Sequence, residues 1–141
     1  MKNKIKYLLL SIFILSLNIS TLLSDEMFNF NVSDIEITQN GNIFKGFNGG
    51  EAFTNNGVSI KANKFEYNKE TSLLISNGDV ELKDKLKNII IEAEEISYLK
   101  NEELILASGN VKMNDSIKEL SINADKITFK KNEGIITANS N

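Results

Sequence analysis

Apolar residues fall at every second position through many short stretches of the chain, and polar residues fill the positions between them. Ile60 and Ala62 are followed by Phe65 and Tyr67, with Lys, Asn and Glu in between. A period of two is typical of a β-strand that buries one face. Between Ala62 and Phe65 the parity slips by one residue, which predicts a β-bulge or a bend at this point.

Polar turns separate these stretches. They are expected at 68–71, 100–103 and 130–134, and at the glycine-containing pairs Asn40-Gly41, Gly49-Gly50 and Asn56-Gly57. Asn, Gly, Lys and Glu at such positions favour turns between short strands. No segment after residue 24 shows sustained helical spacing. The pattern therefore predicts an all-β fold, a meander of short antiparallel strands whose apolar faces must meet in a sandwich, a jelly roll or a trough.

The chain also repeats itself with a period of 31 residues. Segment 60–82 aligns without gaps with segment 91–113, and a third copy begins at Ile122. The positions that agree in all three copies are Ile60/Ile91/Ile122, Ala62/Ala93/Ala124, Phe65/Ile96/Ile127, Tyr67/Tyr98/Phe129, Lys69/Lys100/Lys131 and Leu74/Ile105/Ile136. A fixed internal period indicates stacked copies of one supersecondary unit. Gly78 and Gly109 also match, and a glycine inside a strand marks a kink or a close approach.

Residues 1–24 have the layout of a secretory signal peptide. Three lysines precede an apolar run from Tyr7 to Leu23, and acidic residues follow it. The alternative is an uncleaved membrane anchor, because a run of 17 residues is at the lower limit for spanning a bilayer. In both cases we expect residues 25–141 to form one β domain outside the cytoplasm.

Composition excludes several kinds of chemistry. The sequence has no Cys, His, Pro, Trp or Arg, which removes disulfides, Cys/His zinc sites, thiol nucleophiles and histidine bases. Beyond residue 24, 13 lysines stand against 19 acidic residues, a net charge of −6. This balance argues against a nucleic-acid partner. Glu92, Glu94 and Glu95 are expected to form a polar face rather than a metal site, and we expect neither a cofactor nor an enzyme activity.

The repeat resembles a known family. In each copy Ala is followed by Asn, Glu or Asp, and then, with one residue between each, by Phe or Ile and by Tyr or Phe. After the turn, the first two copies carry Ser or Ala, one further residue, Gly, Asp or Asn, and Val. This pattern is similar to the OstA-like repeat of the lipopolysaccharide-transport proteins LptA and LptC and of the N-terminal domain of LptD. The resemblance runs from about Ile35 to the end and is strongest from Val58 to Met113. Because the third copy stops before its Gly-Asn-Val, we expect a truncated reading of a longer protein.

The resemblance implies an antiparallel β-jelly roll shaped as a trough that shields the acyl chains of lipopolysaccharide. It also implies docking onto other proteins of the family by strand addition at free edges, with energy supplied elsewhere. The preferred interpretation is the periplasmic N-terminal domain of an LptD-like outer-membrane protein. The alternatives are a separate LptA-like periplasmic bridge, an LptC-like anchored subunit and, from a different class, a structural β-repeat of a surface adhesin that binds no lipid.

The candidate lipid-binding residues are the apolar positions of the repeat. They are Ile60, Ala62, Phe65, Tyr67, Leu74, Val80, Leu82, Ile91, Ala93, Ile96, Tyr98, Ile105, Val111, Met113, Ile122, Ile127 and Phe129. The same pattern fits a plain hydrophobic core equally well. The two tyrosines fit either the trough mouth or cross-strand packing. The lysines that recur at 69, 100 and 131 fit either contact with lipid phosphates or, as we expect, solvated turns.

Overall fold

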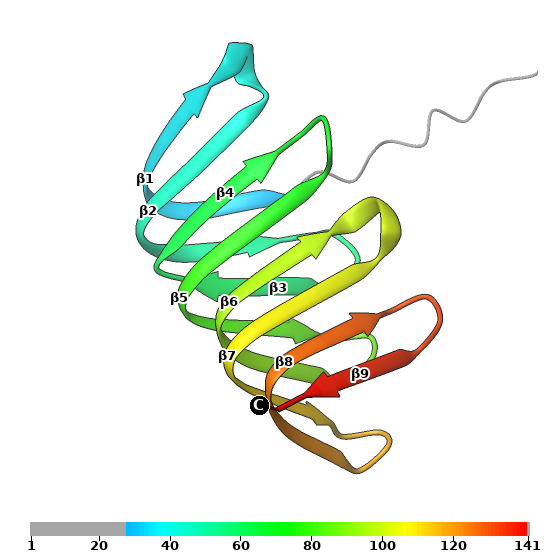
Figure 1. Cartoon of the computed structure of the whole chain (residues 1–141). Helices are drawn as coiled ribbons and strands as arrows, with labels where there is room; N and C mark the ends of the chain where they lie inside the picture. Colours follow the sequence, from blue (N-terminus) through cyan, green and yellow to red (C-terminus); the bar gives the residue numbers. More distant parts are fainter. Residues whose placement is uncertain (1–27, 141) are drawn as a thin grey trace, which may run out of the picture.

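The computed structural model describes residues 28–140, which form one antiparallel sheet of nine strands (Figure 1). The expected signal segment, residues 1–24, lies outside the described residues. The strands are β1 (Asn29–Thr38), β2 (Ile43–Phe53), β3 (Val58–Ala62), β4 (Lys64–Asn68), β5 (Leu73–Asp84), β6 (Ile89–Leu99), β7 (Leu104–Asp115), β8 (Leu120–Lys130) and β9 (Ile135–Asn139). Two short 3-10 turns are η1 (Gln39–Gly41) and η2 (Lys100–Glu102). No helix among these residues is long and apolar enough to cross a membrane.

Neighbours in the sheet are mostly neighbours in the sequence. The order is β1-β2-β3-β5-β6-β7-β8-β9, and β4 pairs with β2 and β5. Strands β3 and β4 thus act as two halves of one strand, interrupted at Asn63, whose N–H bonds to the carbonyl oxygens of Asn77 and Gly78 at 3.1 and 3.0 Å. The 31-residue period is the spacing between successive hairpin turns, which lie at 54–57, 85–88 and 116–119.

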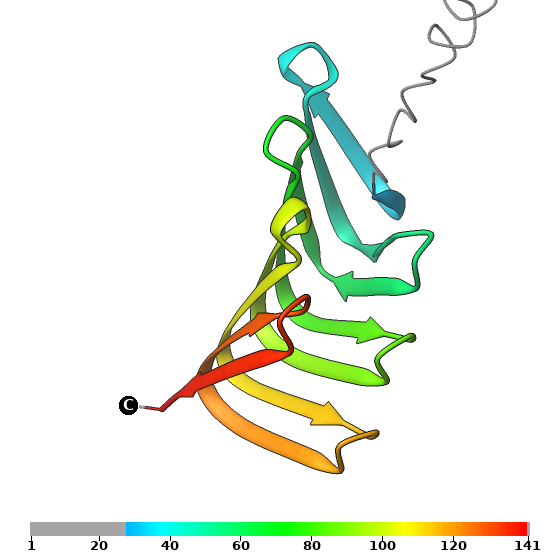
Figure 2. The same cartoon turned by 90° about the vertical axis from the view of Figure 1, so that its right-hand side faces the viewer.

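The long strands bend in the middle. The registers of β5–β6, β6–β7 and β7–β8 shift between Asn77 and Val80, Glu92 and Glu95, and Ser108 and Val111. These shifts confirm the bulges that the change of parity predicts. The bend divides the sheet into two layers that diverge from a common edge (Figures 1 and 2). Layer A holds β4, β9 and the strand halves next to η1, η2 and the turns at 69–72 and 131–134. Layer B holds β3 and the strand halves next to the hairpin turns at 54–57, 85–88 and 116–119.

Two predictions of local structure need correction. The sequence predicts short strands, but β5 and β7 are 12 residues long because each continues through its bend. Gly49-Gly50, predicted as a turn, lies inside β2 at the bend. Cross-strand hydrogen bonds on both sides of the bend keep each half in the same strand. The turns expected at Asn40-Gly41 and Asn56-Gly57 are confirmed.

The core lies between the two layers. Inward-facing residues of each layer alternate with outward-facing polar ones, so closing one layer on the other buries both apolar faces at once. Ile60, Leu74, Leu82, Ile91 and Ile105 are fully buried in this way. The fold is therefore a bent β-jelly roll in which a single sheet covers its own apolar face.

Gly109 provides a test of the bend. Its φ is +80°, and a Cβ at this position would lie 2.7 Å from Cβ of Glu94. We expect Gly109→Ala to lower the free energy of unfolding by about 2–3 kcal/mol, because the backbone strain adds to the steric conflict.

Gly134→Ala is the matched control, since Gly134 has a φ of +68° but a Cβ added there would meet no atom within 4 Å. It should cost only about 1 kcal/mol in urea denaturation. Equal losses for the two variants would show that the close approach at the bend contributes nothing.

Candidate functional site

The candidate lipid-binding residues all face the space between the layers. Those on layer A are Phe65, Tyr67, Leu74, Ile96, Tyr98, Ile105, Ile127 and Phe129, and those on layer B are Ile60, Ala62, Val80, Leu82, Ile91, Ala93, Val111, Met113 and Ile122. All are buried except Ile122, which is half-buried. They form one continuous apolar interior, in which the side chains of the two layers pack against each other.

Some interior residues were not among the sequence candidates. Phe28, Ala52, Val58, Ile89 and Ala107 also belong to the core. The 31-residue spacing between Val58 and Ile89 carries the signal for these two, just ahead of the copies aligned above. Ala107 has Ser76 as its repeat equivalent, and Ser76 Oγ is buried without a hydrogen-bond partner.

Aromatic rings fill the N-terminal end of the interior. Phe28 is 6% exposed and its ring lies 5.3 Å from the ring of Tyr67 and 5.8 Å from that of Tyr98, both edge-on. Phe30 lies 6.2 Å from both Phe44 and Phe65. These spacings are favourable for aromatic pairs. The cluster thus closes the space between the layers next to β1.

A buried ion cluster joins the free ends of the two layers. Lys131 of layer A places Nζ 3.1 Å from Oδ2 of Asp84 in layer B and 2.8 Å from Oε2 of Glu103. The same ammonium donates to the hydroxyl of Tyr98 at 3.2 Å, and that hydroxyl donates to Glu103 at 2.8 Å. Lys87 of layer B adds a second link by donating to the main-chain oxygen of Lys131. We call Asp84, Glu103, Lys131 and Tyr98 the clasp.

The prediction of a solvated turn lysine is wrong for Lys131, and the structure decides between the two alternatives for the tyrosines. Lys131, expected to be a solvated turn residue, is only 4% exposed because two carboxylates and a hydroxyl surround it. Lys69, at the equivalent turn, lies half-buried with Nζ 4.4 Å from the centre of the Phe44 ring. Tyr67 and Tyr98 are both buried, so their rings belong to the packed interior rather than to an exposed rim.

The C-terminal end of the interior is more open. Among residues 28–140, layer B ends at β8, whereas layer A continues to β9, which pairs only with β8. On the inner face Ile122, Ala124 and Ile136 are half-buried, and Leu120 is 38% exposed. Because no other strand of the described chain covers these side chains, apolar surface of the interior reaches solvent here.

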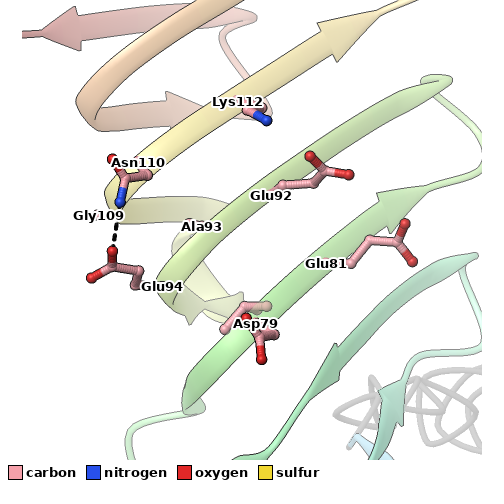
Figure 3. A pocket seen from close by; sticks show the side chains of 9 residues that line it. Asp79, Glu81, Glu92, Ala93, Glu94, Gly109, Asn110 and Lys112 are labelled. Atoms are coloured by element: carbon pink, nitrogen blue, oxygen red, sulfur yellow. Dashed lines mark hydrogen bonds between the residues drawn. The ribbon is translucent and has the colours of Figure 1, made fainter.

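A separate pocket lies on the outer face of layer B beside the bend (Figure 3). Its polar lining includes Asp79, Glu81, Glu92, Glu94 and Lys112. Asn110 donates to Glu94 at 2.7 Å, and Lys112 is the cross-strand neighbour of Glu92. Within residues 28–140, no three acidic side chains come close enough to hold a metal ion. The pocket is a solvated, charged surface.

Comparison with known proteins gives a match at the level of structure. No protein-family model matches the sequence, and no curated protein matches it. Among solved structures, the fold is similar to that of LptH from Pseudomonas aeruginosa, described as the LptA-homologous periplasmic component of the lipopolysaccharide transport device. The TM-score is 0.72 at 11% sequence identity, with 82% of this chain and 84% of LptH covered. The fold is thus the trough-shaped β-jelly roll of the LptA type.

The clasp gives a stability prediction. Lys131→Met leaves the buried carboxylate of Asp84 without its cation, and we expect it to lower the free energy of unfolding by about 3–5 kcal/mol. Adding Asp84→Asn should restore part of this loss, because Asn keeps an oxygen for the N–H groups of Leu86 and Lys87 that Asp84 accepts.

Lys130→Met is the control, since the Lys130 side chain is 51% exposed in its pair with Glu133. Urea denaturation should show a change below about 0.5 kcal/mol for this variant. A loss at Lys131 as small as that at Lys130, or no recovery in the double variant, would contradict the clasp.

Proposed function

We propose that this protein is a periplasmic carrier of lipopolysaccharide of the LptA type, which shields lipid acyl chains between its two layers. The observation that carries this proposal is the continuous apolar interior of an LptA-type fold, open to solvent at β8 and β9.

Energetics favour an apolar lining for such a task. Exposing one acyl chain of about a dozen carbons to water costs on the order of 10 kcal/mol, at roughly 0.8 kcal/mol per CH₂ group. Inward-facing side chains of the two layers can replace that water. Since they now pack against each other, a bound chain must separate the layers and exchange side-chain contacts for contacts with lipid.

The two ends of the interior differ in how easily they can admit a chain. Phe28 and Phe30 fill the N-terminal end, and the clasp joins the layers along their free ends. Ile122 and Ala124 at the C-terminal end are only half-buried. We therefore infer that an acyl chain enters between the layers at β8 and β9.

Free strand edges suit the expected protein partners. Within residues 28–140, β1 and β9 each pair with one strand only, and the layer B half of β8 has no neighbour beyond it. Unpaired N–H and C=O groups at such edges can bind a further strand. We propose that other troughs of this fold dock there and extend the apolar interior from one protein to the next.

A second candidate is the N-terminal domain of an LptD-like protein of the outer membrane. The long aromatic segment before the repeat, from Phe28 to Phe53, favours it. The extent of the structural match favours the LptA-type carrier, because the match spans 84% of the LptH chain. An LptC-like subunit requires residues 7–23 to remain as a membrane anchor. An adhesin requires the apolar interior to be a hydrophobic core that binds no lipid.

Photo-crosslinking tests lipid contact. A photo-crosslinking residue at Ile122, on the inner face of β8, should capture lipopolysaccharide in living cells. The same residue at Asn123, exposed on the outer face, is the matched control and should capture little. Equal labelling at both positions, or none at either, would contradict the carrier function and favour the adhesin.

Cell fractionation tests which member of the family the protein resembles in role. The LptA-type role predicts that an antibody against residues 60–113 detects a small protein in the soluble periplasm. A band several times larger in the outer membrane would instead support the LptD-like role. A small band in the inner membrane would support the anchored LptC-like role.

A further inference from the structure

The hairpin turns of layer B form a row at the free end of that layer. Figure 2 shows the turns at 54–57, 85–88 and 116–119 projecting in the same direction. A Cβ at Gly57 would lie 3.6 Å from Leu86 Cγ, so the first turn reaches the second. We call 85–88 and 116–119 the tip turns.

Each tip turn exposes one large aliphatic side chain. Leu86 is 74% exposed and Ile117 is 66% exposed, the two highest values among the large exposed hydrophobic residues of the described chain. They are equivalent positions, 31 residues apart, and the same position in the first turn is Asn55. The turn therefore does not require an apolar residue there.

Buried carboxylates hold both tip turns in the same shape. Oδ1 of Asp84 accepts the N–H groups of Leu86 and Lys87, each at 3.1 Å. Oδ1 of Asp115 accepts those of Ile117 and Lys118 at 3.0 and 2.9 Å. The exposed aliphatic side chains consequently project from fixed backbone and lose little further backbone freedom when they contact a partner.

Lysines surround these aliphatic side chains. Lys85 and Lys87 flank Leu86, and Lys118 follows Ile117, against one acidic residue, Glu119, within the two tip turns. Both neighbouring aspartates, Asp84 and Asp115, are buried at 3% exposure. Asp84 is paired with Lys131, and Asp115 lies 3.8 Å from Lys118. Three lysines against Asp115 and Glu119 leave the tips a net charge of +1, in a chain whose net charge beyond residue 24 is −6.

An apolar pocket of about 260 Å³ lies between the tip turns and layer A. Leu86, Ile89, Ile117 and Phe129 contribute its apolar walls, and Lys87 and Lys118 its cationic groups. Ile89 and Phe129 are also members of the buried core. The pocket connects the tips with the apolar interior of the trough.

We infer that the tip turns dock the protein onto an anionic lipid surface, with Leu86 and Ile117 inserted among the acyl chains and the lysines at the headgroups. Aliphatic side chains beside Lys are the combination that binds such a surface, by apolar burial and by attraction to anionic headgroups. This contact goes beyond the proposed transport function, and it places the pocket at the lipid surface.

The size of the apolar feature favours lipid over a second copy of the chain. A stable protein–protein interface buries roughly 800 Å² on each partner. Two side chains on narrow turns cannot supply such an area to another folded surface. A lipid surface deforms around each side chain, so it requires no matching shape.

Single tryptophans test this contact, because the chain has none of its own. Leu86→Trp and Ile117→Trp should each show a blue-shifted emission with vesicles of phosphatidylglycerol, and a smaller shift with phosphatidylcholine. Leu106→Trp, at a 45% exposed site on the outer face of layer A, is the control and should not shift. Every variant carries the same N-terminus, so differences between them report the labelled positions.

Vesicle binding by the full chain supplies a second measurement. Leu86→Ser with Ile117→Ser should lower the partition coefficient for anionic vesicles at least about tenfold. Lys85→Gln with Lys118→Gln should remove the preference for anionic over neutral vesicles and reduce the dependence on salt. Leu106→Ser and Lys64→Gln should leave binding unchanged.

Three outcomes would overturn the inference. They are no spectral shift at positions 86 and 117, a shift of equal size at position 106, and self-association that the Leu86→Ser, Ile117→Ser variant abolishes. The last result would identify a second copy as the partner. Vesicle binding with no lipopolysaccharide captured at Ile122 would contradict the carrier function alone, so the two proposals fail separately.

Discussion

The apolar face of a single sheet is removed from water only when something covers it. In this protein one half of the sheet covers the other half. Bends in the middle of β5, β6, β7 and β8 turn each strand back so that its two halves bury opposite walls of the same interior. In β5 and β7 the break in the ladder coincides with the positive φ of Gly78 and Gly109. The layers, their free ends and the open C-terminal end all result from this one constraint.

Closing the sheet in this way leaves three boundaries, and each has a different chemistry. The N-terminal end is filled by the rings of Phe28 and Phe30, and the free ends of the layers are joined by the Asp84–Lys131 pair. The C-terminal end keeps half-buried apolar residues such as Ile122. This asymmetry makes the C-terminal end the most open of the three boundaries within residues 28–140.

The repeat made much of this predictable. Alternation identifies the strands, the 31-residue period identifies the stacked hairpins, and the slip between Ala62 and Phe65 locates the bend from the sequence alone. These are short-range properties, because a strand's alternation and a bulge depend on neighbours in sequence. The inward positions follow from the same alternation, which explains why the candidate residues all face the interior.

What the sequence determined by itself is the β class, the period, the bends and the apolar face. Only the tertiary structure decided which polar residues become buried and which apolar residues remain exposed. In the sequence, nothing distinguishes Lys131 from other turn lysines. In the fold, the opposite layer places Asp84, 47 positions earlier, beside its ammonium group. Leu86 and Ile117 are apolar but remain 74% and 66% exposed, because their hairpin turns extend beyond the packed layers. Both outcomes depend on the distance between the layers, which is set by the packing of the whole sheet rather than by local sequence.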